Sequence, residues 1–242
     1  MAPRPGGTLR VASYNIHRAI GTDRHKDPAR IASVLSELGS DILGLQEVDW
    51  HHDHRVDEAQ FEYLAHLPGY RAIAGPNLID HRGHYGNLLL TRLPVRTVRQ
   101  IDLSAGGREP RGAIDLDLDL HTGHMPLRVI VTHLGLGLRE RWRQANRLRQ
   151  LLAQPPHRPT LLLGDFNDWL PGCPTLRPLR ALCDATRHPA SYPSAHPLLA
   201  LDRILTCGLR RPAQVRTHQS ALTRVASDHL PIVADIDTPA GI

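Results

Sequence analysis

The chain has 242 residues, of which 41% are hydrophobic and 22% charged, so it can bury a sizeable core and is not expected to be disordered. Its formal net charge of +5 suits an anionic partner such as phosphate, nucleic acid or a lipid headgroup. Lys26 is the only lysine, so an Arg-rich coding habit explains the same excess of positive charge. No apolar run approaches the length of a membrane span.

The three cysteines, Cys173, Cys183 and Cys207, are odd in number and form no CxxC pair. We expect ordinary buried thiols rather than a disulfide framework or a zinc site. Residues 1–10 contain no apolar segment typical of a secretion signal, so the expected compartment is cytoplasmic. No linker or repeat divides the chain, which predicts a flexible N-terminus at residues 1–8 followed by a single catalytic domain at 9–238.

Hydrophobic periodicity predicts a first strand at residues 9–16, followed by a helix that Asp27 caps, Pro28 begins and Gly39 ends. Two more helices are predicted at 57–67 and 138–152. Short apolar runs predict the remaining strands at residues 41–46, 70–74, 87–91, 96–103, 113–120, 127–132, 160–163, 201–206 and 230–236. Two packed sheets covered on the outside by helices satisfy this order.

Two of these elements also carry predictions about their faces. The strand at 113–120 alternates strictly, and we expect Asp115, Asp117 and Asp119 to form its solvated face. In the helix at 138–152, Leu138 and Trp142 begin an apolar stripe at helical spacing. The arginines of this helix are then expected on the opposite, solvated face, although such a row could also follow a polyanion.

Polar side chains stand repeatedly where an apolar strand ends or begins. Strand ends meet along one rim of a sheet, so residues distant in sequence are expected to converge there. The residues at these positions are Asn15, Glu47, His133, Asp165, Asn167, Asp228 and His229. Each one alone is more often a turn, surface or core residue, and the case rests on the ordered set.

The residue types indicate metal-assisted chemistry on a phosphoester. A hard divalent cation prefers carboxylate and amide oxygen, which Glu47, Asn15 and Asp228 supply. The candidate for positioning the attacking water is Asp165. Hydrogen-bond donors for the developing negative charge are available from Asn167, His133 and His229.

Seven segments, in this order, resemble the endonuclease/exonuclease/phosphatase superfamily, which has a DNase I-like fold. They span nearly the whole chain, and they match the small bacterial members best. The segments are Val11-Ala12-Ser13-Tyr14-Asn15-Ile16, Leu45-Gln46-Glu47, Tyr85-Gly86-Asn87, Thr132-His133-Leu134, Gly164-Asp165-Phe166-Asn167, Leu201-Asp202-Arg203-Ile204 and Ser227-Asp228-His229-Leu230-Pro231.

The resemblance implies an α/β fold, namely a four-layer α/β sandwich with two central, mostly antiparallel β-sheets flanked by helices. It implies Mg²⁺ as the cofactor, with Mn²⁺ as a substitute, and Glu47 as the principal metal ligand supported by Asn15 and Asp228. The catalytic residues that it implies are Asp165, Asn167, His133, His229 and Asp202, with Asp202 fixing the tautomer of His229.

Three further residues are candidates for substrate binding. Arg111 could reach phosphate, or it could be a solvated turn residue, with about equal weight. Asn87 lies in a matching segment, and His17 stands where some family nucleases carry an aspartate. The polar cluster at residues 51–55 could face the cleft, but a solvated loop is favoured.

We therefore expect a divalent-metal-dependent phosphodiesterase that acts on nucleic acid or a small phosphodiester. A lipid-headgroup phosphodiesterase of the sphingomyelinase kind, or a phosphatase, is the alternative. The lipid alternative is weakened because no apolar hairpin with exposed aromatic residues is visible. A catalytically inactive binding module ranks last, and no protein partner is predicted.

Overall fold

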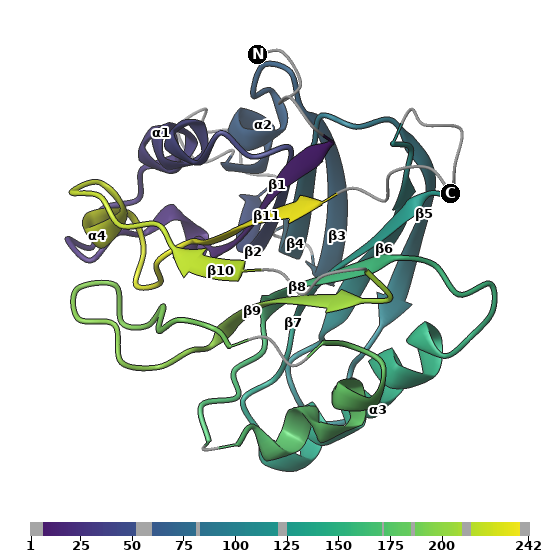
Figure 1. Cartoon of the computed structure of the whole chain (residues 1–242). Coiled ribbons are helices and arrows are strands. Elements are labelled where there is room, and N and C mark those ends of the chain that lie inside the picture. The colour runs from purple at the N-terminus through teal and green to yellow at the C-terminus, as the bar shows by residue number, and fades with distance from the viewer. Residues whose placement is uncertain are drawn as a thin grey trace.

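The computed structural model describes residues 7–51, 60–80, 83–120, 125–170, 172–184, 187–209 and 214–237. Two β-sheets lie at the centre of the molecule (Figure 1). Helices α1 (Pro28–Leu38) and α2 (Gln60–Ala65) lie outside one sheet, and α3 (Leu138–Leu152) lies outside the other. This arrangement confirms the predicted α/β sandwich of two sheets flanked by helices.

The first sheet has six strands, and all its neighbours are antiparallel except β1 and β2, which are parallel. Their spatial order is β10 (Gln214–Thr217), β11 (Ile232–Asp237), β1 (Thr8–Asn15), β2 (Ile42–His51), β4 (Gly83–Thr91) and β3 (Arg71–Asp80).

The second sheet has five strands, and again one pair, β7 and β8, is parallel while the others are antiparallel. Their order is β5 (Val95–Asp102), β6 (Gly112–Leu118), β7 (Leu127–His133), β8 (Thr160–Asp165) and β9 (Asp202–Cys207). Fully buried Val11 and Leu89 of the first sheet share one apolar cluster with Val129 and Leu163 of the second, so the main core lies between the sheets.

Helix α1 forms where its sequence signals predict. The Asp27 carboxylate accepts a hydrogen bond from the backbone N–H of Arg30 at 2.9 Å, which caps the first turn behind Pro28. Gly39 ends the helix with a φ of 53°, a left-handed conformation that glycine adopts at little cost. The short helices η1 (His17–Ala19), η3 (Pro174–Ala181) and α4 (Thr223–Ala226), and strand β10, were not predicted.

Helix α3 has the predicted bounds, and Ala145, Leu148 and Leu152 further along the predicted stripe are buried, but the start of the stripe is not. Leu138 and Trp142 are about half exposed, whereas Arg141 is only 1% exposed. The polar residues on the buried face hold the preceding loop: the Arg141 guanidinium donates to the backbone carbonyl of Leu136 at 2.6 Å, and the Gln144 side chain accepts from the N–H of Gly135. The prediction that Leu138 and Trp142 face inward is therefore wrong.

The row of aspartates on β6 is likewise not a solvated face. Asp115 is 1% and Asp117 4% exposed, because arginines cover them. Arg128 donates two hydrogen bonds to the Asp115 carboxylate, at 2.8 and 2.7 Å, and Arg99 donates two more at 3.0 Å. The alternation was read correctly as one face of a strand, but the polar face is buried because its charges are paired.

The prediction of three unpaired thiols is also wrong. Cys183, which follows η3, forms a disulfide with Cys207 at the end of β9. The two lie 24 residues apart, so only the fold brings them together, and spacing alone did not indicate the pair. The cytoplasmic location expected from the sequence stays a prediction.

Two predicted segments extend beyond the residues that the structure describes. Residues 52–55 of the polar cluster at 51–55 lie outside the described residues, as do residues 1–6 of the predicted flexible N-terminus. Strand β1 begins at Thr8, and the single domain predicted at 9–238 stays a prediction. No helix in the described ranges is long and apolar enough to cross a membrane.

Candidate functional site

The strand topology brings the predicted site residues to one rim of the sandwich. Strands β7 and β8 are parallel, so His133 and Asp165 lie side by side at their carboxyl ends. Strand β9 runs antiparallel to β8, and its first residue, Asp202, is therefore the register partner of Asp165. In the other sheet, Asn15 ends β1 and is the register partner of Gln46, the residue before Glu47 in β2.

One amide links the two sheets at this rim. The Asn15 side-chain nitrogen donates to the Asp165 carboxylate at 3.1 Å and to the Glu47 carboxylate at 3.0 Å. Asn15 is 1% exposed, and its backbone carbonyl accepts a hydrogen bond from the Ser227 hydroxyl. Carboxylate oxygens from β2 and β8 therefore converge on a single buried point.

Glu47 reaches that point because β2 is interrupted. The register between β2 and β4 shifts between Leu45 and Val48, and Glu47 itself has a φ of 58°. A left-handed conformation at a glutamate is uncommon and costs free energy, and a β-bulge redirects a side chain that would otherwise follow the alternation of the strand. The irregularity turns Glu47 toward Asn15.

Asp165 sits on an equally constrained turn. Gly164 precedes it with a φ of 155°, and a Cβ there would lie 1.9 Å from the Thr132 carbonyl oxygen, so only glycine fits. After it, Asn167 has a φ of 52°, and its backbone N–H donates to the Asp165 carboxylate at 2.9 Å. The Gly-Asp-Phe-Asn segment thus fixes Asp165 by sterics and by its own hydrogen bond.

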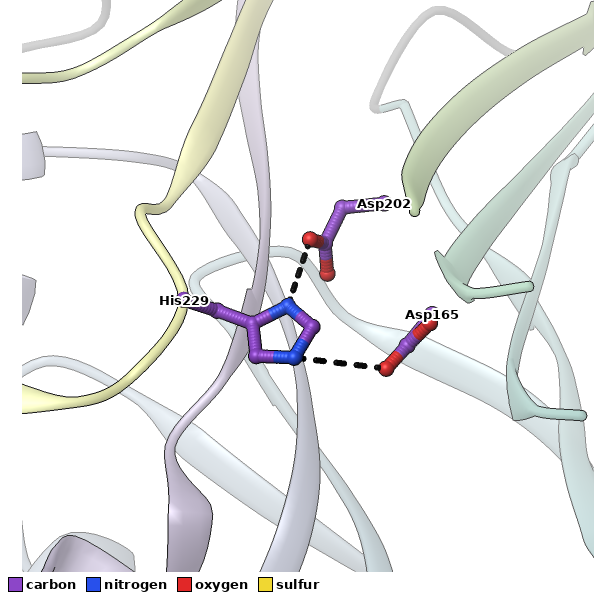
Figure 2. A group of neighbouring side chains, drawn as sticks. All are labelled: Asp165, Asp202 and His229. Carbon is purple, nitrogen blue, oxygen red and sulfur yellow. Dashed lines mark hydrogen bonds and ion pairs between the residues drawn. The ribbon is translucent and has the colours of Figure 1, made fainter. Parts of the chain in front are cut away.

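His229 lies between two aspartates (Figure 2). Its Nδ1 is 2.8 Å from the Asp202 carboxylate, and its Nε2 is 3.7 Å from Asp165. Burial by itself lowers the pKa of His229, but Asp202, Asp165 and Asp228 outweigh it and raise the pKa to about 10. The ring is therefore an imidazolium at neutral pH, held between carboxylates.

His133 has the opposite character although it contacts the same Asp165, at 3.5 Å. Burial, with further help from Arg111 and His229, lowers the pKa of His133 to about 3 against the effect of Asp165. The Arg111 guanidinium lies 3.1 Å from Nδ1, and an arginine can only donate. Nδ1 is then the acceptor, and the proton of neutral His133 sits on Nε2, toward the Asp165 carboxylate.

The remaining predicted residues lie at different distances from this centre. Arg111 is buried and bonded to His133 and Glu109. His17 lies at the margin of the site. Its ring Nδ1 is 3.8 Å from the Asp228 carboxylate, and its backbone N–H donates to the Asn15 amide oxygen.

Asn87 is different, because it is fully buried and donates to the Gly112 carbonyl at 3.1 Å. Its side chain therefore binds the backbone of the residue that follows Arg111. Substrate contact by Asn87, His17 and Arg111 stays a prediction.

Several residues that support the site did not stand out in the sequence. The Ser191 hydroxyl donates to the Asp202 carboxylate at 2.5 Å, and the Tyr192 ring lies 4.9 Å from the His229 ring. Both belong to an irregular loop, where no strand end marks them. Burial and the nearby Glu47 raise the pKa of Tyr85, so its hydroxyl stays protonated beside the site.

Two groups of residues could hold a cation. Ligand atoms of Asp165, Asp202 and His229 lie within 4.8 Å of one another. However, His229 Nδ1 and the Asp202 oxygen are already at hydrogen-bond distance, 2.8 Å, which leaves no room for an ion between them. The Glu47 and Asp165 carboxylates both approach the Asn15 amide, and two carboxylates this close suit a hard cation such as Mg²⁺.

Comparison with known proteins identifies the family to which the chain belongs. The model of the Endonuclease/Exonuclease/phosphatase family matches residues 12–229. The chain belongs to this family. It is also 28% identical over 244 residues to the uncharacterized protein YbhP of Escherichia coli (strain K12), covering 95% of this chain and 96% of YbhP.

Solved structures of family members share the fold. An endonuclease/exonuclease/phosphatase from Beutenbergia cavernae matches with a TM-score of 0.75 and 23% identity, covering 96% of this chain and 72% of that one. A mannosyl-6-phosphatase from Bacteroides thetaiotaomicron matches with a TM-score of 0.68 and 20% identity, covering 93% and 98%. Members of the family are hydrolases that act on phosphoesters, so the chain is a phosphoester hydrolase in the general sense.

Proposed function

We propose that the protein is a divalent-metal-dependent phosphodiesterase that promotes attack of water on phosphorus. The observation that carries the proposal is the position of Asp165, which contacts Asn15, His133 and His229 at once. A carboxylate held by donors from both sheets has one defined orientation. This carboxylate could accept a proton from water, and the His229 imidazolium lies 3.7 Å from it.

Glu47 and Asn15 would hold Mg²⁺, or Mn²⁺ in its place, with Asp228 as a further carboxylate. A bound divalent ion would supply Lewis-acid stabilisation of the charge that develops on the phosphoryl oxygens. The half-buried Glu47 would supply carboxylate oxygen, which suits a hard cation. The buried Asn15 would turn its amide oxygen toward the ion, because its side-chain nitrogen faces Glu47 in this structure. Asp228 lies at the margin of this group, near His17.

The side chains at the site would then have separate roles in the reaction. Asp165 would accept the proton of the attacking water as the new O–P bond forms and the ester O–P bond breaks. The His229 imidazolium, oriented by Asp202, would donate a hydrogen bond to a phosphoryl oxygen. Asn167, neutral His133 and Arg111 would hold the remaining phosphate oxygens in place.

A generic aryl phosphodiester tests the activity. Purified protein should release 4-nitrophenol from bis(4-nitrophenyl) phosphate with Mg²⁺, lose this activity with a chelator, and recover it when the metal is restored. Asp165→Asn, which keeps the shape of the side chain, should abolish turnover. Undiminished turnover in that variant, or turnover that survives the chelator, would remove the proposal. Faster hydrolysis of a monoester than of the diester would favour a phosphatase.

The natural substrate is a narrower question. Nucleic acid or a small phosphodiester is the substrate favoured by the +5 charge and by the four arginines of α3 that are not buried, Arg139, Arg143, Arg147 and Arg149. If nucleic acid is bound through several phosphates, the affinity of an Asp165→Asn variant for oligonucleotides must fall steeply with salt. A lipid headgroup is the second candidate, and it is favoured by the exposed apolar side chains beside the site. No protein partner is predicted.

A further inference from the structure

Large apolar side chains stand exposed on segments that adjoin the catalytic residues. Leu136 is 73% exposed and closely follows His133 at the end of β7. Trp169 is 56% exposed and closely follows Asn167. Leucine and tryptophan at such exposure, close in sequence to the site residues, are typical of an interaction site rather than of ordinary surface.

The segments that carry these side chains are neighbours in space. The Asn167 side chain donates to the Leu134 carbonyl at 2.9 Å, which joins the loop after β7 to the loop after β8. A third loop reaches the same place, since Tyr192 packs against His229 and its carbonyl accepts the N–H of Leu198 at 2.8 Å. Leu198 is 78% exposed.

Helix α3 extends this apolar surface away from the site. Leu138 is 52% and Trp142 53% exposed, and they lie one turn apart on the same face of the helix. The Arg141 guanidinium donates to the Leu136 carbonyl at 2.6 Å, so the start of the helix is fixed against the loop. Leu136, Leu138 and Trp142 are therefore exposed on one short, fixed segment, which we call the strip.

Positive charge borders the strip. Arg139 and Arg143 are exposed on α3, and the Arg108 guanidinium carbon lies 3.8 Å from where a Cβ on Gly137 would be. None of these three arginines forms a salt bridge within the described ranges. The one acid of the helix, Glu140, is buried and accepts from the N–H of Gly137. The border therefore complements an anionic partner.

We propose that this surface, which we call the docking rim, binds an anionic lipid surface and presents the catalytic site to it. The docking rim consists of Leu136, Leu138, Trp142, Trp169, Leu198, Arg108, Arg139 and Arg143. Tryptophan and leucine enter the boundary between headgroups and acyl chains, while arginines stay with the lipid phosphates.

The leucines decide between a lipid surface and a polynucleotide. Nucleobases stack on aromatic rings, so Trp142 and Trp169 alone would suit either partner. The three leucines of the rim are exposed in the protein alone. A phosphate backbone would not remove them from water, whereas the acyl region of a lipid surface would bury them and so stabilise the complex. The sequence did not show this surface because its apolar residues come from three loops and one helix rather than from a single hairpin.

Membrane binding by the docking rim does not depend on the proposed function. Delivery of a lipid phosphodiester headgroup to Asp165 does rest on that function. Binding is therefore measured without turnover. Wild-type protein and Asp165→Asn should both sediment with phosphatidylcholine vesicles that contain phosphatidylglycerol, and hardly at all with phosphatidylcholine alone. If Asp165→Asn binds but no phosphoester is hydrolysed by the wild type, the docking stands and the phosphodiesterase does not.

Substitutions at the docking rim should weaken binding in a defined way. Trp142→Ser and Trp169→Ser should each lower vesicle affinity about tenfold through lost apolar burial. Arg139→Gln and Arg143→Gln should each lower it about fivefold, and salt should diminish their effect.

The matched controls lie on the other sheet and its helix. Tyr63→Ser, at 51% exposure on α2, and Arg71→Gln, exposed on β3, should leave vesicle binding unchanged. Three results would overturn the proposal. The first is that the wild type does not bind the phosphatidylglycerol vesicles, and the second is that the control variants lose as much affinity as the rim variants. The third is that the wild type binds oligonucleotides or self-associates, and that the rim variants lose this property instead of vesicle binding.

Discussion

The side-chain nitrogen of Asn15 lies 3.1 Å from the carboxylate of Asp165, although 150 residues separate them and they belong to different sheets. The contact exists because β1 and β8 both end at the same rim with the apolar core packed between the sheets. Catalytic geometry at the rim therefore depends on how the two sheets pack. A change in that packing would move Glu47 and Asn15 relative to Asp165 and His133.

Glu47→Gln should separate metal binding from folding. The amide keeps the size of the side chain but removes the charge that a hard cation requires. We expect calorimetry to show clearly weaker Mg²⁺ binding, and turnover of the aryl diester to be nearly lost. The thermal unfolding midpoint should change little, since Glu47 is only half-buried. Unchanged Mg²⁺ affinity would assign the principal ligand to another residue.

Asp115 should make the fold sensitive to acid. Burial by itself raises the pKa of Asp115, but hydrogen bonds from Arg128 and Arg99 outweigh it and hold the pKa below its ordinary value. A carboxyl with a depressed pKa in the folded state stabilises the fold above the pKa of the unfolded chain, about 4, and this stability is lost as the pH falls through the folded pKa. Denaturant unfolding between pH 2 and 6 should therefore show falling stability toward acid.

The Asp115→Asn variant tests this assignment. It should be less stable at pH 6 by about 3 kcal/mol, because two arginines lose a buried partner, and its stability should depend less on pH. Asp119→Asn is the matched control just beyond the end of β6, where the pair with the exposed Arg96 contributes little. Equal pH dependence in wild type and Asp115→Asn would show that other carboxyls govern acid unfolding.

The disulfide predicts a thiol count and a stability change. Denatured, unreduced protein should show one reactive thiol, that of Cys173, and reduced protein should show three. The bond closes a loop of 24 residues, so Cys183→Ala/Cys207→Ala should cost about 3 kcal/mol of unfolding free energy. Three reactive thiols without reductant would mean that the two cysteines stay reduced in the isolated protein.

Much of the fold was predictable because its signals are local. Asp27, Pro28 and Gly39 bound α1 through capping and backbone preference, which neighbouring residues decide. The polar residues at strand ends were visible for the same reason, since a buried apolar run that stops at an aspartate or a histidine needs a partner. The resemblance to a known family then placed these residues in one site.

The remainder depends on contacts between distant residues. Arg141 is buried because the Leu136 carbonyl needs a donor, and no pattern within α3 shows that need. Asp115 is buried because Arg99 and Arg128 on the flanking strands reach it. Ser191 and Tyr192 reach the site from an irregular loop, where periodicity gives no signal. Local sequence patterns therefore predict the secondary structure and the burial that a residue favours. Its hydrogen-bond and ion-pair partners from distant segments become known only from the fold.

The pair formed by His229 and Asp202 gives the sharpest test of the catalytic arrangement. Nδ1 of His229 lies 2.8 Å from the Asp202 carboxylate, so Asp202 fixes which ring nitrogen points toward Asp165. His229→Ala should lower the rate about 10²–10⁴-fold. Asp202→Asn should lose much of the same activity, because an amide can present the wrong hydrogen-bonding group to Nδ1.

Since the two residues act as one unit, the double variant should be little slower than His229→Ala alone. Rates on the aryl diester, measured at saturating Mg²⁺ for all four proteins, complete the cycle. Ser191→Ala is the matched control, because it removes a 2.5 Å hydrogen bond to Asp202 while leaving the charge and the His229 contact. It should cost far less than Asp202→Asn. Losses that add fully in the double variant would show that Asp202 acts elsewhere than through His229.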